Sequence, residues 1–450
     1  MPKKKTALTI EERLQQALVP AEEQPYEVPE NWVWVRLGAI AEIVTGGTPS
    51  KKHPEYYGGN FPFYKPSDLD QGRLTYDASE YLSEEGKNVS RIIPKNSTAV
   101  CCIGSIGKCG YLMCEGTTNQ QINSAIPKIN SLCLYYYLCT ENFVQDLLSM
   151  ASATTIAIVN KSKMESCAFP LPPLSEQQRI VERIEELLAK LDEAKERLQD
   201  VADSFAVRKA AILHNAFTGE LTKQWRRENG VSDESWEESN FGKFTVSQYG
   251  YTEKAHWEKV GPKFLRITDI QDNKVDWDEV SWCPIDEAGM KQYAVQIGDI
   301  MIARTGATTG KSYLICDDVE AVFASFLIRL KVVDKNLDYN YLYGYMQSED
   351  YWRQITDFSS GIAQPGVNAN KLKQIKFKCP SLPEQHEIVR LIDDLLARER
   401  AAQQAAEQAL ASIDLMKKSI LARAFRGELG TNKASEASAL ELLKQVLAEN

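Results

Sequence analysis

The sequence lacks the features that would place the protein in a membrane or in an oxidising compartment. Its 450 residues contain no run of 18 apolar residues, so we expect no membrane-spanning helix. Three lysines stand near the start, but no apolar stretch follows them, which argues against a secretory signal. Ten cysteines occur without a Cys-x-x-Cys pair, which predicts free, mostly buried thiols. These observations together predict a cytoplasmic protein.

Motifs for catalysis and nucleotide binding are also missing. The chain has no Gly-x-Ser-x-Gly elbow and no His-Glu-x-x-His pair. Gly306-Ala-Thr-Thr-Gly-Lys311 has three residues between its glycines, where a phosphate-binding P-loop needs four. The only four histidines stand far apart, at His53, His214, His256 and His386. We therefore predict no catalytic residue, no metal site and no cofactor in this chain.

The charge balance does not suggest a nucleic-acid binder. Lysine and arginine total 52 against 62 aspartates and glutamates, which gives a net charge of −10. No large segment of the chain has a basic excess. Binding to DNA would therefore need local basic patches or a basic partner protein.

What the sequence does contain is a long internal repeat with a constant offset of 208 residues. Residues 170–221 and 378–429 align without a gap and share 20 identities in 52 positions. The repeat includes Ala216-Phe-Thr-Gly-Glu-Leu221, which returns as Ala424-Phe-Arg-Gly-Glu-Leu429. A period this long excludes a solenoid and predicts two copies of one unit, each a globular head followed by a long helix.

Each repeated segment has the heptad spacing of a coiled coil. We expect two helices of about 43 residues, or roughly 65 Å each, that pair antiparallel within one chain. In the first helix the predicted seam also includes Ala194 and Val201, and in the second Ala402, Ala406, Ala409 and Met416. The main seam residues are Ile180, Ile184, Leu187, Leu191, Leu198, Ile388, Ile392, Leu395, Ile413 and Ile420.

Two other arrangements of these helices remain open from the sequence. Each helix could pack only on its own head, although such a length would overhang a compact domain. Alternatively, the helices of two chains could pair with each other.

The predicted fold class is mixed α/β (α+β) heads plus long helices, in a pseudo-twofold internal repeat. Strands are expected at 31–37, 98–103, 299–303 and 326–332, and helices at 131–149 and 338–357. The predicted segments are an N-terminal extension 1–25, head one 26–170, a helix 171–222, head two 223–380, a helix 381–429 and a tail helix 430–450.

Loops of the two heads also resemble each other. Phe63-Tyr-Lys-Pro-Ser-Asp-Leu69 is similar to Phe264-Leu-Arg-Ile-Thr-Asp-Ile270, and Gly104-Ser-Ile-Gly-Lys108 is similar to residues 306–311. A turn of this composition after a strand can offer N–H groups and a lysine to a DNA phosphate, or it can be a plain hairpin turn. Residues 119–123 are rich in amides, which can pair with adenine but more often bond within strands and turns.

The ordered set of motifs resembles the specificity subunit of type I restriction–modification systems. The resemblance covers most of residues 26–429. Its motifs are Val28-Pro-Glu-Asn-Trp32, Gly46-Gly-Thr-Pro-Ser50, Gly104-Ser-Ile-Gly-Lys108, Leu171-Pro-Pro-Leu-Ser-Glu-Gln177 and Phe217-Thr-Gly-Glu-Leu221.

The resemblance implies a non-catalytic, sequence-specific DNA-binding subunit. Each head would be a target recognition domain for one half of a bipartite, asymmetric site in double-stranded DNA. The antiparallel coiled coil would separate the heads and act as a ruler. The implied partners are two methyltransferase (modification) subunits and restriction/translocase subunits. S-adenosylmethionine, ATP and magnesium would be bound by those partners. The alternative that we retain is a two-headed coiled-coil scaffold that binds a ligand other than DNA.

For DNA contact we select basic and polar residues in the loops that the heads share. In head one these are Lys51, Lys52, Tyr64, Lys65, Ser105, Lys108 and Lys163. In head two they are Lys263, Arg266, Arg304, Thr305, Lys311, Gln364 and Lys371.

Overall fold

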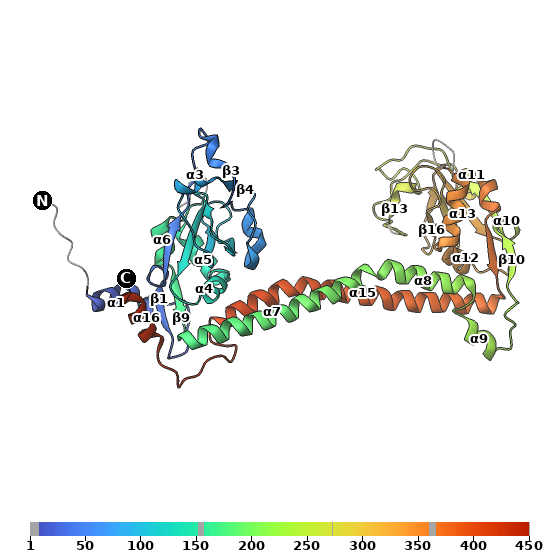
Figure 1. The fold of residues 1–450 in the computed structure, drawn as a ribbon. Coiled ribbons are helices and arrows are strands. Elements are labelled where there is room, and N and C mark those ends of the chain that lie inside the picture. The colour runs from blue at the N-terminus through green and yellow to red at the C-terminus, as the bar shows by residue number, and fades with distance from the viewer. Residues whose placement is uncertain (1–8, 152–156, 272, 360–365, 450) are drawn as a thin grey trace. The chain divides into compact units, whose positions relative to one another are not determined.

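The computed structural model describes residues 9–151, 157–271, 273–359 and 366–449. The chain forms two compact units, which are drawn in Figure 1. Unit 1 combines residues 1–198 with 408–450, and unit 2 contains residues 199–407. Each unit therefore holds one head, the start of the helix that follows that head, and the end of the other long helix. The predicted domain boundaries are a different division, because they follow segments along the chain.

Head one is built on a four-stranded antiparallel sheet in the order β2-β8-β5-β6. Beside it, β3 pairs with β4 and with β7, and β1 pairs with β9. The strands of unit 1 are β1 Val33–Arg36, β2 Ala41–Thr45, β3 Tyr57–Tyr64, β4 Glu80–Leu82, β5 Thr98–Cys101, β6 Cys109–Tyr111, β7 Thr117–Thr118, β8 Ile122–Pro127 and β9 Ala168–Leu171. Its shorter helices are α1 Ile10–Ala17, η1 Ala21–Glu23, α2 Leu37–Ile40, η2 Pro54–Tyr56, η3 Asp68–Leu74, α3 Glu84–Asn88, α4 Ser131–Leu138, α5 Glu141–Met150, α6 Lys161–Ser166 and α16 Ala439–Ala448.

Head two repeats this plan with the sheet order β11-β18-β15-β16 and the pair β10-β19, which confirms the repeat predicted for the heads. Its strands are β10 Glu237–Asn240, β11 Thr245–Tyr249, β12 Lys263–Leu265, β13 Ile270–Gln271, β14 Lys274–Val275, β15 Ile300–Ala303, β16 Ser312–Leu314, β17 Ala321–Phe323, β18 Leu327–Val332 and β19 Lys376–Cys379. Its shorter helices are α9 Lys223–Glu228, α10 Phe241–Phe244, η4 Ile267–Asp269, α11 Glu287–Tyr293, α12 Tyr339–Tyr345, α13 Glu349–Ser359 and α14 Ala369–Lys373.

The second long helix, α15, runs from Leu382 to Ala424 and has the predicted 43 residues. The first does not form one helix as predicted, because it is divided into α7, Leu174–Asp203, and α8, Phe205–Thr218. At the division the Val201 carbonyl accepts bonds from the Arg208 guanidinium at 3.0 Å and the Ser204 hydroxyl at 3.3 Å. These side chains compete for a carbonyl that a regular helix would use internally, and such bonds bend helices.

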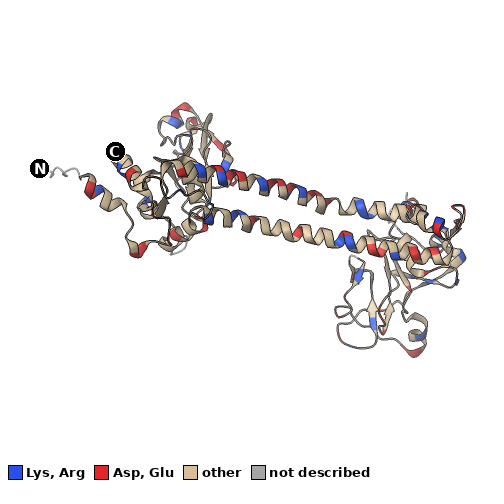
Figure 2. Cartoon of the chain, turned by 90° about the horizontal axis from the view of Figure 1, so that it is seen from below, with Lys and Arg blue, Asp and Glu red and all other residues tan. Residues whose placement is uncertain are grey.

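The long helices pair antiparallel within each unit. In unit 1 an ion pair of 2.6 Å joins Lys417 of α15 to Asp192 of α7. In unit 2 Arg208 of α8 pairs with Glu399 of α15 at 2.5 Å. Figure 2 shows acidic and basic residues interspersed along the ribbon of these helices. Exposed ion pairs such as Lys190–Glu186 and Arg197–Glu193 agree with this mixture.

The predicted seam residues divide into two groups. Ile180 and Ile184 belong to the core of head one, and Ile388 and Ile392 belong to the core of head two. Each helix thus packs on its own head at its start, as one of the alternatives proposed, before it continues beyond the head. Ile413 is buried, and the remaining main seam residues are half-buried: Leu187, Leu191, Leu198, Leu395 and Ile420.

Three further positions that we assigned to the seam are exposed, so these assignments were wrong. Val201 and Met416 are 38% and 48% exposed, and Ala402 is also exposed. A pair of helices has only a narrow contact stripe, so some positions of a heptad pattern lie outside it.

The repeated Phe-x-Gly-Glu-Leu motif ends each long helix in the head of the same unit. Phe425, just after α15, packs in the core of head one against Tyr137, with ring centroids 5.1 Å apart. Phe217, at the end of α8, packs in head two against Tyr345 at 5.4 Å. Head one is therefore completed by the end of α15, which is distant from it in sequence, whereas the end of α8 directly precedes head two.

A pair of buried glutamates fastens the same junctions. Glu176, at the start of α7, accepts bonds from the Trp32 indole at 2.7 Å and from the Thr431 hydroxyl at 3.2 Å. Glu384, at the start of α15, accepts a hydrogen bond from the Thr222 hydroxyl at 2.7 Å. The Arg226 guanidinium also donates to this carboxylate, at 2.8 Å, and forms an ion pair with it. The following Gln177 and Gln385 accept the backbone N–H groups of Asn130 and Asp338, which are also 208 residues apart.

The N-terminal extension contains the short helix α1, the predicted tail helix is present as α16, and both pack on head one. Ala17 of α1 and Leu443 of α16 belong to its core. Arg13 donates to the Leu447 carbonyl at 3.2 Å, which joins the two helices.

The ten cysteines are free thiols: five are buried, four partly buried and one, Cys316, is exposed. Within the described ranges, no helix has the length and apolar character needed to cross a membrane.

Candidate nucleic-acid interface

In head one the loops that the sequence singled out meet at one end of the four-stranded sheet. Gly47 N–H donates to the Thr118 carbonyl at 2.8 Å, which joins the loop after β2 to the end of β7. Cys102 N–H donates to Gln121 at 2.7 Å, and Val159 N–H donates to Cys102 at 2.9 Å. Residues 46–53, 102–108, 119–121 and 158–160 therefore form one surface, which we call the loop end of head one.

Head two has the same loop end, held by corresponding backbone bonds. Tyr251 N–H donates to Phe323 at 2.8 Å, Arg304 N–H to Phe326 at 3.1 Å, and Val367 N–H to Arg304 at 2.9 Å. The loops are residues 250–262, 304–311, 324–326 and 366–368. Residues 104–108 connect β5 to β6, and residues 306–311 connect β15 to β16. Both segments are therefore hairpin turns, as one of the two interpretations of the sequence predicted. That geometry is compatible with phosphate binding as well.

Three of the residues predicted to contact DNA lie exposed at the loop end of head one. Lys51 and Lys52 follow β2 and have exposed side chains that form no ion pair with a residue in the described part of the chain. Ser105 is exposed in the hairpin between β5 and β6. These side chains are free to meet a phosphate backbone.

Three other lysines of head one are held by the protein itself. Lys65 pairs with Glu80 at 2.8 Å, and Lys108 pairs with Asp70 at 2.7 Å. The Lys163 ammonium donates to the Met150 carbonyl at 2.7 Å, at the end of α5. In head two Lys371 donates in the same way to Phe358, at 2.6 Å. Lys163 and Lys371 thus cap helices, because a cation is favourable beside the last carbonyls of a helix.

The prediction that Tyr64 contacts DNA was wrong. Its side chain is fully buried in a small core of head one, and its hydroxyl bonds the Tyr76 carbonyl at 3.2 Å. Burial raises the pKa of the Tyr64 hydroxyl well above its ordinary value. The position is apolar in both heads, since Leu265 takes its place in head two and is equally buried. The sequence similarity placed Tyr64 in a shared loop, but the residue is the last of strand β3.

In head two the basic candidates are half-buried and partly engaged. Lys263 donates to Val280 at 2.8 Å and lies 3.8 Å above the Trp282 ring. Arg266 pairs with Asp269 at 2.8 Å, and Lys311 donates to the Ile270 carbonyl at 3.2 Å. Thr305 pairs with Gly366 in an isolated β-bridge at the loop end. Gln364 lies outside the described residues.

Arg304 lies at the centre of the loop end of head two, beside aromatic side chains that the sequence did not reveal. Its guanidinium is 4.9 Å from the centre of the Tyr249 ring. Tyr249 is 42% exposed and Phe326, between β17 and β18, is 60% exposed. Farther along the loop after β11, Trp257 is 73% exposed. A hydrophobic pattern in the sequence cannot separate these residues from core aromatics, because both occur next to strands.

The two loop ends therefore share a backbone frame and differ in their side chains. Head one presents Lys51 and Lys52, which suit a phosphate backbone. Head two presents an arginine with exposed aromatic rings, which suit bases and the methyl group of thymine as well.

The amide-rich segment at 119–123 mostly bonds within the protein. Asn119 donates to Gln121 at 3.0 Å, and Asn123 accepts from the Thr45 hydroxyl at 2.7 Å. Gln120 is exposed and accepts from Thr48 at 2.5 Å. Most of these amides thus form hydrogen bonds within the protein, which is the more ordinary of the two roles that we considered.

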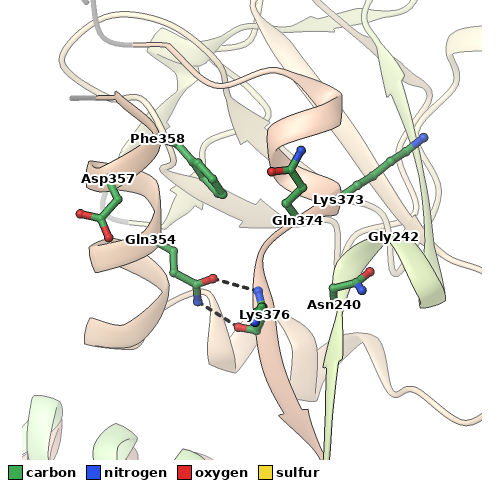
Figure 3. Close-up of a pocket in the computed structure, with 8 residues that line it drawn as sticks. All are labelled: Asn240, Gly242, Gln354, Asp357, Phe358, Lys373, Gln374 and Lys376. Carbon is green, nitrogen blue, oxygen red and sulfur yellow. Dashed lines mark hydrogen bonds between the residues drawn. The ribbon is translucent and has the colours of Figure 1, made fainter. Parts of the chain in front are cut away.

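A pocket of head two shows no converging catalytic groups. In Figure 3 the Gln354 amide points to the backbone of Lys376, where it accepts at 2.8 Å and donates at 2.9 Å. The Asp357 carboxylate and the Lys373 ammonium point away from each other. Within the described ranges, no group of three or more His, Cys, Asp or Glu side chains is placed to hold a metal ion.

Comparison with known proteins agrees with this organisation. The family model described as the type I restriction modification DNA specificity domain matches twice, at residues 29–202 and 234–409. The EcoBI specificity subunit of Escherichia coli is 27% identical over 94% of this chain and 93% of its own length. The EcoKI specificity subunit of Escherichia coli is 24% identical over 94% and 96%. A solved HsdS subunit from Thermoanaerobacter tengcongensis has a TM-score of 0.67 at 18% identity, covering 90% of this chain and 99% of that one.

Because the two matches cover most of the chain, this protein belongs to the family of type I restriction–modification specificity subunits. The structural neighbour shows that the fold, with its two mixed heads and long helices, is that of an HsdS subunit.

Proposed function

We propose that this chain is the DNA-reading subunit of a type I restriction–modification complex in the cytoplasm. Each head reads one half of a bipartite, asymmetric site in double-stranded DNA, and the helices fix the spacing between the halves. The observation that supports this role is the pair of loop ends, in which one backbone frame carries different exposed side chains. Two different readers on one frame are what an asymmetric, two-part site requires.

The chemistry of modification and restriction is proposed to belong to partner proteins. Two methyltransferase subunits would bind S-adenosylmethionine and methylate adenine, and restriction/translocase subunits would use ATP and magnesium. The chain itself would be non-catalytic. Its acidic balance supports this division, because partners would then supply much of the positive charge around the DNA.

A selection of bound DNA tests the proposal. The full chain is co-purified with a type I methyltransferase subunit from the same organism and mixed with a pool of random duplexes. Sequencing of the bound fraction should reveal two short conserved blocks separated by a fixed, unspecified spacer. The methyltransferase subunit without this chain serves as the control. A bound pool with no sequence preference, or the same preference in the control, would contradict the proposal and favour a scaffold that binds another ligand.

A further inference from the structure

Unit 2 contains a cavity of 660 Å³ between head two and the helices α8 and α15. Its floor is apolar, with Leu213, Leu314 and Ile392, which are nearly fully buried, and the half-buried Leu396. Polar and charged side chains line the same cavity: Lys209, Lys274, Asp393 and Arg400. None of the residues that line this cavity belongs to the loop end of head two.

The equivalent place in unit 1 is filled by the chain's own side chains. The Arg73 guanidinium pairs with Glu185 of α7 at 3.2 Å and lies 4.9 Å from the centre of the Tyr111 ring. The Tyr136 hydroxyl donates to the same Glu185 carboxylate at 3.3 Å. One arginine and two tyrosines thus close the groove between head one and its helix.

Sequence equivalence explains why unit 2 stays open. With the offset of 208, Glu185 corresponds to Asp393 and Tyr136 to Gly344, so a large ring is missing. Tyr111 and Leu314 both end the edge strand of their sheet, at the same register from the neighbouring strand. Arg73 and Lys274 each stand four residues after the similar segments 63–69 and 264–270, so the two residues correspond. Each also follows a residue with positive φ, Gly72 at 59° and Asn273 at 60°.

The charges at this place also differ between the units. In unit 1 Lys417 and Asp192 form an ion pair of 2.6 Å. The equivalent residues in unit 2 are Lys209 and Arg400, two cations. With the residues that the structure describes, neither of them forms an ion pair within 4.0 Å, and neither does Lys274. The cavity therefore has three cationic side chains against one carboxylate, that of Asp393.

We propose that this cavity is a docking site for an acidic segment of a partner protein, with an aromatic or large apolar side chain inserted over the leucine floor. The acidic group pairs with Lys209, as Asp192 pairs with Lys417 in unit 1, and also with Arg400. The inserted side chain takes the place of Tyr136. The inference rests on the proposed function, in which the partner protein is the methyltransferase subunit. Because unit 1 has no such open cavity at the equivalent place, the two units would bind their partner copies differently.

A protein side chain fits this site better than DNA does. Lys274 and Arg400 are exposed, so the cations alone would also suit a DNA backbone. A duplex backbone offers nothing to fill the apolar floor at the bottom of the cavity, whereas an inserted side chain does. Buried aromatic anchors in apolar pockets with a charged rim are typical of protein interfaces. Charge complementarity then selects an acidic segment rather than a basic one.

The test gives unit 2 the residues that unit 1 already tolerates. Arg400→Asp restores a carboxylate opposite Lys209, and Gly344→Tyr refills the cavity. The matched control is Arg398→Asp, which makes the same charge change on α15 at an exposed residue that does not line the cavity. Binding of the co-purified methyltransferase subunit to the full chain is measured by mass photometry over a concentration series. One of two partner copies should bind at least about tenfold more weakly to the double variant and to Arg400→Asp alone.

Each outcome has a distinct meaning. Partner binding within about twofold of the unmodified chain for both variants would overturn the inference. Unchanged partner binding together with a salt slope of DNA binding lowered by about one would overturn it in favour of a phosphate contact. No partner binding by the unmodified chain would contradict the proposed function instead. If Gly344→Tyr does not fold, as judged by circular dichroism, Arg400→Asp decides the question alone.

A second measurement needs no substitution. Cys316 lines the cavity and is the one exposed thiol of the chain. Its reaction with a maleimide, located by mass spectrometry, should slow by about tenfold or more in the complex. An unchanged rate in a saturated complex would contradict occupancy of the cavity by the partner.

Discussion

Lys163 and Lys371 are basic residues that the two heads share and whose ammonium groups the fold itself already uses. Both ammonium groups donate to the last carbonyls of a helix in their own head. Lys51 and Lys52, by contrast, extend from a loop of the loop end. At the residue scale, DNA contact is therefore expected from side chains that the fold does not already use.

The Lys51 and Lys52 side chains should hold phosphates without reading bases. We predict that Lys51→Ala with Lys52→Ala weakens binding of the complex to all DNA sequences alike. The slope of log affinity against log salt concentration should fall by up to about two. Fluorescence anisotropy at several salt concentrations measures both quantities. Lys128→Ala is the control, because Lys128 is exposed just after β8, at the opposite end of the same strand. A change in the preferred sequence would show that these lysines read bases.

The Arg179–Glu436 pair fastens the segment after α15 to unit 1, with N–O distances of 2.9 and 2.7 Å. Its hydrogen bonds hold the pKa of the Glu436 carboxyl below its ordinary value. The pKa of Glu436 is lower in the folded chain than in the unfolded chain. The pair therefore contributes its whole stabilisation at pH values well above about 4.3, the ordinary pKa of a glutamate carboxyl. This contribution is lost as the pH falls through the pKa of the folded state.

Glu436→Gln should therefore lower the free energy of unfolding by up to about 1 kcal/mol near neutral pH. The difference from the unmodified chain should shrink as the pH falls below about 4.3. Urea unfolding followed by circular dichroism measures it. Glu441→Gln breaks an exposed pair with Lys444 and should change little. A difference that grows toward acid pH would contradict this role for the pair.

At the scale of elements, the helix pairing differs between the units in its polar contacts. Arg208 and Glu399 form a part-buried ion pair in unit 2, where unit 1 has Met416 and Leu191 at the equivalent positions. A polar pair within a helical seam fixes register more than it adds stability.

We predict that Glu399→Leu alone destabilises the chain by about 1–3 kcal/mol, because it leaves a part-buried guanidinium without its partner. Arg208→Met with Glu399→Leu should return to within about 1 kcal/mol of the unmodified chain. A double-mutant cycle from urea unfolding gives the coupling. Arg398→Met, at an exposed pair with Asp394, is the control. If the losses of stability from the two single substitutions simply add in the double variant, Arg208 and Glu399 are not energetically coupled and the prediction is wrong.

Much of the fold could be predicted from periodicity and repetition. The constant offset and the heptad spacing predict two heads with long helices, and α15 has the predicted length. The division at Ser204 could not be predicted, because it depends on which carbonyl Arg208 reaches. The exposure of Phe326 and the burial of Tyr64 were equally hidden, since strand-flanking aromatics look alike in a sequence until the sheet order is known.

At the scale of the whole molecule, the ruler role makes a prediction about DNA spacing. A seven-residue insertion after Leu198 and after Ala406 preserves the heptad phase and adds about 10 Å to each helix. The spacer in the DNA site should then change by up to about three base pairs, at about 3.4 Å per pair, with both half-sites unchanged. A control insertion of seven residues after Gly230, in the exposed loop between α9 and β10, should leave the spacer unchanged. A change in half-site sequence would contradict the ruler role.

The most direct measurement is a map of methylated adenines in a host that lacks adenine methylation. The chain is expressed with a type I methyltransferase subunit from the same organism, and the genome is sequenced by a method that detects the modified base. We predict N6-methyladenine at one asymmetric, two-part motif, and none when this chain is omitted. Methylation that is unchanged without the chain, or confined to an undivided motif, would contradict the account.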